Sequence, residues 1–324
     1  MKKILIFLLA AAAVTVSCAR ETASDNEELE AEALEAYMQK YHSDAVRTSL
    51  GAYIFPSDEV PGGGDALSDE KYIRINYTIT DRDGHFKSST LRDVNSANGN
   101  YKSGTYYGPV IYYRADGNLP DGLEEMLSGA GTAFGPMKAG GTRKALIPGW
   151  LLSGTTAVYT VTLVEAFDET EVWEKDSLAR FIQKNYPDAV EDEQLGGWYY
   201  LTTRPGEDSE PLSSDSEIYC NYILRDLSGR VIDTNVEKVA KDNGISRSSY
   251  TPQLINWNED YTKITMSGSQ NDVVDGFAKA FLHMHQKEAG IVFFWSGLGY
   301  PSGHGSSIPA YCPLRFDIEL VDKP

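Results

Sequence analysis

The chain has 324 residues, of which 41% are hydrophobic and 23% are charged, and its formal net charge at pH 7 is -18. Such an acidic surface repels a phosphate backbone and no basic cluster offsets it, which excludes nucleic acid as a partner. The length allows two domains of ordinary size.

The first 17 residues resemble a bacterial signal peptide. Lys2 and Lys3 precede an apolar stretch that ends at Val16, and this stretch is shorter than the ~20 residues that a membrane-spanning helix needs. Cys18 follows directly after small residues, as in a lipobox, whose cysteine receives a diacylglycerol group before cleavage. The alternative is an ordinary signal peptide with an incidental cysteine.

The lipobox resemblance implies where the mature chain is located. We expect residues 1–17 to be removed, residues 18–26 to form a polar lipidated tether, and Cys18 to anchor the protein in the cell envelope. The outer membrane is the expected site, with the protein on its periplasmic or its surface side. Removal takes away two lysines and no acid, so the net charge becomes -20.

An internal repeat divides the rest of the chain. Its pieces recur in the same order with a period near 145 residues: 37–46 with 181–190, 50–53 with 195–198, and 72–79 with 217–224. Such a period indicates a duplicated domain and is too long for a solenoid. We therefore expect one domain at 27–168 and a second at 169–324.

Each copy opens with an amphipathic helix. In the first copy Leu29, Ala33, Tyr37 and Tyr41 recur at every fourth position, which predicts one apolar face. In the second copy the corresponding face is marked by Leu178, Phe181 and Ile182.

Strands with alternating apolar residues follow, separated by Gly, Asp and Ser turns. One short helix interrupts them, at 119–126 in the first copy and 273–282 in the second. Each copy closes with an alternating strand, at 157–163 and 314–320. This order predicts an α+β fold in which an antiparallel sheet wraps around a short helix.

After Cys18 the chain contains two further cysteines, too few for a disulfide scaffold. Cys220 alternates with Ile218, Tyr222 and Leu224, so we expect it to face the interior of the sheet. A buried free thiol is favoured over a bridge with Cys312.

Motifs of the second copy resemble the FKBP-type peptidyl-prolyl isomerases over residues 193–323. They share the family's helix start, its methionine, its tyrosine before the flap, its Ile-Pro and its last strand: residues 273–277, Met284, Tyr300, residues 307–309 and residues 314–320. The resemblance implies two tandem FKBP-like domains, each preceded by a helix.

The resemblance also implies a proline pocket in the second copy. In the family's roles, the Tyr300 hydroxyl and the Ile308 backbone N–H bind substrate carbonyls, Phe277 forms the floor, and Asp233 biases the electrostatics. The remaining pocket residues would be Tyr222, Ile232, Val273, Val274 and Phe316. The alternative is that all of these residues only fill the interior of the sheet.

Three positions depart from the family's pattern. Ile232 replaces an aromatic residue, Phe277 replaces a tryptophan, and Pro301 replaces a glycine after Tyr300. The first two changes keep the site apolar, and the third affects the conformation of the flap.

The first copy resembles the same family less closely. Leu123 stands at the tryptophan position, Lys87 or Ser88 stands where the aspartate belongs, and the chain passes from Ser153 into the last strand without a flap or its tyrosine. We expect this copy to be a spacer or a chaperone without catalysis.

No metal or cofactor is expected. His283 and His285 are two residues apart, so they point away from each other on a helix. The glycine-rich segments 62–64 and 129–131 lack the Lys-Ser/Thr of a phosphate loop.

The expected partners are proline-containing exported polypeptides, the membrane through Cys18, and a second copy in a possible homodimer formed by the leading helices. Two alternatives to the isomerase stay open. One is a non-catalytic peptide- or protein-binding chaperone lipoprotein, and the other is a structural subunit of the envelope.

Overall fold

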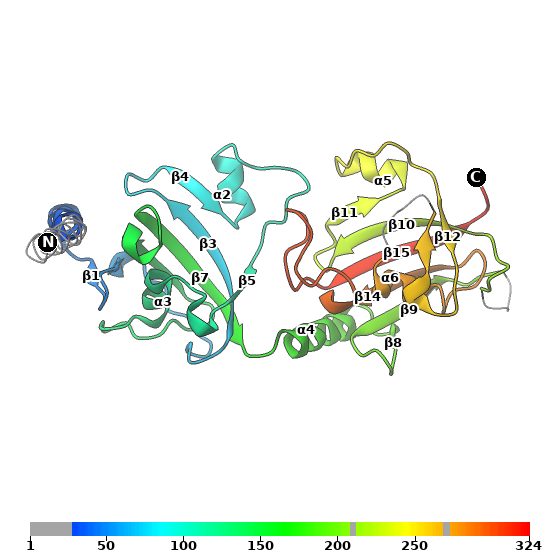
Figure 1. The fold of residues 1–324 in the computed structure, drawn as a ribbon, viewed down its shortest axis with the longest axis horizontal. Coiled ribbons are helices and arrows are strands. Elements are labelled where there is room, and N and C mark those ends of the chain that lie inside the picture. Colours follow the sequence, from blue (N-terminus) through cyan, green and yellow to red (C-terminus); the bar gives the residue numbers. More distant parts are fainter. Residues whose placement is uncertain (1–27, 208–211, 268–272) are drawn as a thin grey trace, which may run out of the picture. The chain divides into compact units, whose positions relative to one another are not determined.

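The computed structural model describes residues 28–207, 212–267 and 273–324 (Figure 1). The expected signal peptide, the tether and Cys18 lie outside the described residues. Within the described ranges, no helix combines the length and the apolar character needed to cross a membrane.

The chain divides into two compact units. Among the described residues, the first unit holds 28–69 together with Tyr77–Ser88 and Asp116–Val164. The second unit holds Glu70–Asn76, Ser89–Ala115 and Glu165–Pro324. The domain bounds expected from the repeat stay a prediction.

The first copy contains a seven-stranded sheet with the order β1-β2-β6-β7-β3-β4, and β5 pairs with β3. Residues 28–41 form the leading helix. The other elements are β1 (Val46–Arg47), β2 (Tyr53–Ile54), β3 (Tyr72–Thr80), β4 (Phe86–Ser89), α2 (Arg92–Ala97), β5 (Val110–Tyr113), α3 (Asp121–Ser128), β6 (Thr142–Ile147) and β7 (Ala157–Phe167), with short 3-10 turns η1 (Pro56–Asp58), η2 (Ala115–Gly117) and η3 (Gly149–Leu151).

The second copy contains an eight-stranded antiparallel sheet with the order β13-β12-β10-β15-β14-β9-β8, and β11 pairs with β10. Its elements are α4 (Thr170–Asn185), β8 (Val190–Glu191), β9 (Trp198–Arg204), β10 (Ile218–Asp226), β11 (Val231–Thr234), α5 (Glu237–Asp242), β12 (Gln253–Asn256), η4 (Tyr261–Lys263), β13 (Thr265–Met266), α6 (Asp275–Ala280), β14 (Ala289–Phe294), η5 (Ser296–Leu298) and β15 (Leu314–Val321). The α+β class predicted from the sequence is confirmed.

The leading helix at 28–41 forms as predicted, but a different face of it is buried. Leu34 and Met38 pack against Tyr53 and Leu146, whereas Leu29 at the start of the predicted stripe is 62% exposed. A stripe of every fourth residue drifts by about 40° at each step, so three steps shift it by about 120°, a third of the way around the helix. The pair Leu34 and Met38 forms the shorter stripe that the sheet covers.

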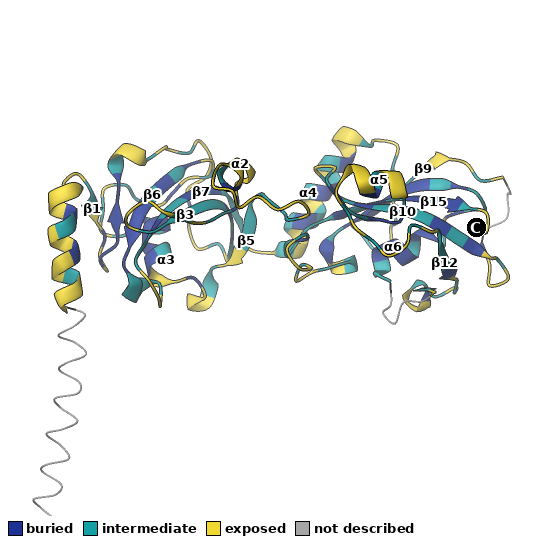
Figure 2. Cartoon of the chain, turned by 90° about the horizontal axis from the view of Figure 1, so that it is seen from above, coloured by how far each residue is buried: buried dark blue, intermediate teal, exposed yellow. Residues whose placement is uncertain are grey.

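Strand β14 places α4 and α6 on opposite faces of the second sheet. Ile291 and Phe293 belong to the cluster formed with α4, while Val292 and Phe294 belong to the core around α6. This alternation follows from the two-residue period of a strand. Strand β15 alternates in the same way, and Figure 2 shows its buried positions in dark blue.

A glycine at the second position of α3 and of α6 explains the shared Asp-Gly of the two copies. A Cβ at Gly276 would lie 2.3 Å from the Phe294 ring, and a Cβ at Gly122 would lie 2.2 Å from the Ile147 side chain. Both short helices therefore contact the sheet at a distance that only glycine permits.

The short helices α2 and α5 are not predicted from the sequence, because six residues give no clear apolar stripe. Most residues of α5 are exposed (Figure 2).

Both cysteines of the described residues are free. Cys220 is buried, so the predicted buried free thiol is confirmed, and Cys312 is half-buried.

A buried carboxylate joins α4 to η5 in the second unit. Glu174 has no exposed surface, and its two oxygens accept hydrogen bonds from the Ser296 N–H and hydroxyl, both at 2.7 Å. Burial raises the pKa of Glu174 above its ordinary value of 4.5, although the Ser296 hydrogen bonds oppose the change. The fold therefore favours the protonated acid.

Glu174→Gln is expected to remove one pH-dependent contribution to stability. Since the folded pKa is raised, this carboxyl stabilises the fold fully below about pH 4.5, and the contribution is lost as pH rises through the folded value. Wild type should thus lose stability relative to Glu174→Gln as the pH rises above about 4.5. Thermal unfolding midpoints of both proteins across this range measure the difference. Asp176→Asn, an exposed change on the same helix, is the control, and parallel curves for wild type and Glu174→Gln would contradict the prediction.

Candidate functional site

The structure brings together all nine residues predicted for the proline pocket, and all of them belong to the second unit. Four are buried in its main core cluster and four are half-buried against that cluster: Tyr222, Phe277, Ile308 and Phe316 in the first group, and Ile232, Val273, Val274 and Tyr300 in the second. The ninth, Asp233, is bonded to Tyr222. Their catalytic roles stay predictions.

The floor of the site is a packed aromatic cluster. The Phe277 ring centre lies 4.7 Å from that of Phe316 and 6.0 Å from that of Tyr222. Only 2% of Phe277 is exposed. The accessible part of the site is therefore the rim, formed by Ile232, Val273, Val274 and Tyr300.

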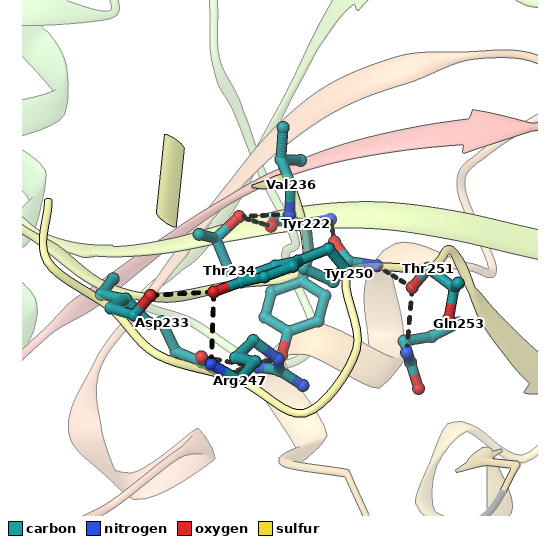
Figure 3. A network of polar contacts seen from close by, with 10 residues as sticks. Tyr222, Asp233, Thr234, Val236, Arg247, Tyr250, Thr251 and Gln253 are labelled. Atoms are coloured by element: carbon teal, nitrogen blue, oxygen red, sulfur yellow. Dashed lines mark hydrogen bonds and ion pairs between the residues drawn. The ribbon is translucent and has the colours of Figure 1, made fainter. Parts of the chain in front are cut away.

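A polar network borders this floor (Figure 3). The Tyr222 hydroxyl donates to Asp233 Oδ2 at 2.7 Å. Arg247 Nη1 lies 2.6 and 2.7 Å from the two Asp233 oxygens and 2.8 Å from the Tyr222 oxygen. Burial and the Asp233 carboxylate raise the pKa of Tyr222, which keeps its hydroxyl protonated as a donor. The side chains of Tyr222, Asp233 and Arg247 therefore form one connected hydrogen-bond network.

Buried polar residues hold this network on strands β10 and β11. Asn235 Oδ1 accepts from the Tyr222 N–H at 2.8 Å, and its amide nitrogen donates to the Cys220 carbonyl at 3.0 Å. The Thr234 hydroxyl donates to the Tyr222 carbonyl at 2.6 Å and accepts from the Val236 N–H (Figure 3). Because these partners fix the backbone on both sides, the Tyr222 and Asp233 side chains have a defined place.

Tyr300 connects the rim to the flap, which is the segment that follows η5 and runs from Tyr300 to Ile308. Its ring centre lies 5.0 Å from that of His304. Burial and the nearby charge of Asp233 raise the pKa of Tyr300, so this hydroxyl also remains a donor. The rim thus presents a protonated hydroxyl beside apolar side chains.

The flap itself is closed by a pair of backbone hydrogen bonds. The Ile308 N–H donates to the His304 carbonyl at 3.2 Å, and the His304 N–H donates to the Ile308 carbonyl at 2.8 Å. The N–H that the FKBP resemblance assigns to a substrate carbonyl therefore already has a partner in this structure. Substrate could use it only if this bond opened.

Arg247 was missed by the sequence analysis. It lies in a polar segment after α5, 14 residues from Asp233 in the chain, and no motif marks it. The available signal is that Arg247 is the only basic residue between Lys241 and Lys263. A half-buried aspartate needs a cation, and a basic residue within loop reach is the natural candidate.

The two histidines lie in the segment that follows α6 and not on a helix, so the helical spacing expected for them does not apply, and they take separate partners. The His283 ring lies 4.9 Å from the Trp198 ring centre, and burial lowers its pKa. His285 Nδ1 lies 3.0 Å from Glu288. The pair forms no common ligand set.

One group of possible metal ligands lies in the first unit, at the turn between β3 and β4. Ligand atoms of Asp81, Asp83 and His85 lie within 4.8 Å of one another. However, Asp81 already accepts the N–H groups of Asp83 and His85 and pairs with Lys87 at 3.2 Å. These contacts account for the cluster as a structured turn.

No protein-family model and no curated protein sequence matches the chain. Similar solved structures include a peptidyl-prolyl cis-trans isomerase from Pseudomonas syringae pv. tomato, with 20% identity, a TM-score of 0.33, and coverage of 49% of this chain and 98% of that one. The three FKBP domains of wheat FKBP73 match with 13% identity, a TM-score of 0.31, and coverage of 85% and 95%. FkpA from Escherichia coli matches with 18% identity, a TM-score of 0.33, and coverage of 47% and 58%.

These identities and TM-scores are low, so they describe an overall likeness and do not assign a function to the chain. The fold implied by the sequence motifs is nevertheless visible in the structure itself, where each copy has an antiparallel sheet around a short helix that begins with Asp-Gly. Each copy therefore has the arrangement of sheet and short helix that the resemblance of the sequence motifs to FKBP-type proteins implies.

Proposed function

We propose that the second unit is a peptidyl-prolyl cis-trans isomerase of exported proteins. The observation that carries the proposal is the network of Tyr222, Asp233 and Arg247 beside the half-buried apolar rim. Turning an X-Pro bond means crossing a barrier of about 18–20 kcal/mol that comes from amide resonance. It needs no nucleophile, acid or metal, only a site that favours the twisted amide.

Each part of the site has a role in this proposal. Ile232, Val273 and Val274 provide apolar contact for the proline ring and exclude water from it. The Tyr300 hydroxyl donates to a substrate carbonyl, and the Asp233 charge acts on the polarised amide. Since about 1.4 kcal/mol of barrier is tenfold in rate, a shallow rim is sufficient for measurable activity.

The cellular setting is proposed from the sequence alone. The segment before Cys18 supports export and a lipid anchor in the cell envelope, where the clients would be proline-containing polypeptides. The first unit would act as a spacer or chaperone. A homodimer through the leading helices stays a prediction, and sedimentation of the full chain tests it.

A proline-containing chromogenic peptide tests the proposal with the full chain. We expect catalysis above the uncatalysed rate, and a loss of about tenfold in kcat/KM for both Tyr300→Phe and Asp233→Val. Tyr41→Phe, an exposed change on the leading helix, is the control and should keep full activity. Wild type that does not exceed the uncatalysed rate overturns the isomerase.

A second candidate is a non-catalytic module that binds peptides or proteins. The close contact of Phe277 with Phe316 and the engaged Ile308 N–H favour it, because both reduce what the site offers to a substrate. In that case the full chain binds the same proline peptide, as measured by fluorescence anisotropy, without accelerating its isomerisation.

A further inference from the structure

A second site lies in the second unit, and none of its lining residues is one of the nine residues of the predicted proline pocket. A cavity of about 720 Å³ opens between the loop before β5, helix α4, the turn after β10 and the segment before β15. The Tyr106 N–H donates to the Ser306 carbonyl at 2.8 Å, which joins two of these walls. The volume is within the range of about 300–1,000 Å³ that ligand pockets occupy.

The wall of this cavity is positively charged, although the chain as a whole is strongly acidic. Arg74, Arg92, Arg180 and Arg230 line it, together with only two acidic residues. Arg74 pairs with Glu165 at 2.9 Å and Arg230 pairs with Asp226 at 2.8 Å. An excess of two positive charges therefore belongs to Arg92 and Arg180.

The described contacts of these two arginines include no carboxylate. The Arg92 guanidinium lies 5.1 Å from the Tyr101 ring centre, and Arg180 donates to the Ser177 hydroxyl at 3.1 Å. Both side chains are exposed. A planar guanidinium without an acidic partner is suited to bidentate recognition of a carboxylate.

Aromatic side chains and a donor complete the lining. Tyr101 stacks on Tyr107 with ring centres 5.5 Å apart, and Trp173 stacks on Phe167 at 4.7 Å. The Trp173 indole nitrogen is buried and has no hydrogen-bond partner among the described residues. Tyrosine and tryptophan walls with arginines are typical of surfaces that bind polypeptides.

We propose that this cavity binds an acidic segment of a polypeptide, whose carboxylates pair with Arg92 and Arg180 while its apolar parts contact the tyrosines. Among the residues that line the cavity, Tyr101 is 42% exposed, so a polypeptide longer than the cavity can extend past it into solvent. A short acidic segment is favoured over a nucleic acid because only two lining guanidinium groups, those of Arg92 and Arg180, lack a carboxylate partner among the described contacts, too few for a row of phosphates. The inference is independent of prolyl isomerisation.

Fluorescence anisotropy of a labelled, capped Glu-Tyr-Glu peptide with the full chain tests this inference. We expect binding that weakens with added salt, and affinity lower by about tenfold or more for the Gln-Tyr-Gln peptide and for the double variant Arg92→Gln/Arg180→Gln. Arg82→Gln/Arg204→Gln removes the same charge from exposed arginines outside the cavity and should bind like wild type.

Equal binding of both peptides, or full binding by Arg92→Gln/Arg180→Gln, would overturn the proposal. Displacement of the acidic peptide by free glutamate or citrate at similar concentration would also overturn it, in favour of a small organic anion. Isomerase activity toward an uncharged peptide should be the same in wild type and in Arg92→Gln/Arg180→Gln. An inactive enzyme that still binds the acidic peptide would contradict the proposed function alone.

Discussion

Arg247→Met is expected to lower kcat/KM for prolyl isomerisation by about tenfold or more, mainly through kcat. The guanidinium contacts both Asp233 oxygens and the Tyr222 hydroxyl, all within 2.8 Å. Without it, the Asp233 carboxylate keeps its hydrogen bond to Tyr222 as its remaining side-chain contact among the described residues, and it can turn toward solvent. Arg247 is thus a positioning residue, and peptide isomerisation by the variant at several substrate concentrations separates kcat from KM.

Two further variants distinguish positioning from a general structural role. Arg247→Lys keeps the charge and should recover part of kcat, because one ammonium can still reach the carboxylate. Arg225→Met breaks a comparable ion pair of β10 with Asp317, with similar exposure, and should leave kcat unchanged. If Arg247→Met retains wild-type kcat, the network does not support catalysis.

A double-mutant cycle of Asp233→Asn and Arg247→Met measures how far the two side chains act together. Because they share hydrogen bonds, the loss in the double variant should be smaller than the product of the single losses. Independent effects would show that Arg247 acts elsewhere.

The confirmed predictions of burial concern residues whose environment follows from the alternation of apolar and polar residues along a strand. Leu314, Phe316, Ile318 and Leu320 alternate along β15 and are all buried, because a central strand has one face on the core. The predicted buried face of the leading helix is wrong, because residues 28–41 contain two apolar stripes. Packing against the sheet determines which of the two stripes is buried.

The polar partners could not be predicted in the same way. Arg247 and Asp233 meet across a loop whose course the sequence does not specify. Arg143 is a stronger example, since its position on β6 suggests a solvated cation and yet it is 1% exposed. Its partner Glu59 lies 84 residues earlier in the chain, so only the fold brings the two charges together.

Arg143→Met is expected to destabilise the first unit by about 3–5 kcal/mol, the usual cost of breaking a buried ion pair by removing one partner. Arg143 Nε and Nη2 donate to Glu59 at 2.8–3.1 Å, and Nη1 donates to the carbonyls of Met126 at 2.8 Å and Gly135 at 3.1 Å. The change leaves a carboxylate and two carbonyls without this partner. Hydrogen exchange of the backbone amides in β6 and β7, measured at increasing urea concentrations, gives the loss in free energy of unfolding.

The neighbouring Lys144 provides a matched control for this experiment. Lys144→Met breaks an exposed ion pair with Asp58 at 3.2 Å and should cost less than about 1 kcal/mol. The double variant Arg143→Met/Glu59→Leu replaces the buried arginine and its half-buried partner by apolar groups and should recover most of the lost stability. If Arg143→Met costs no more than Lys144→Met, the buried arginine contributes packing alone and its charge is dispensable to the fold.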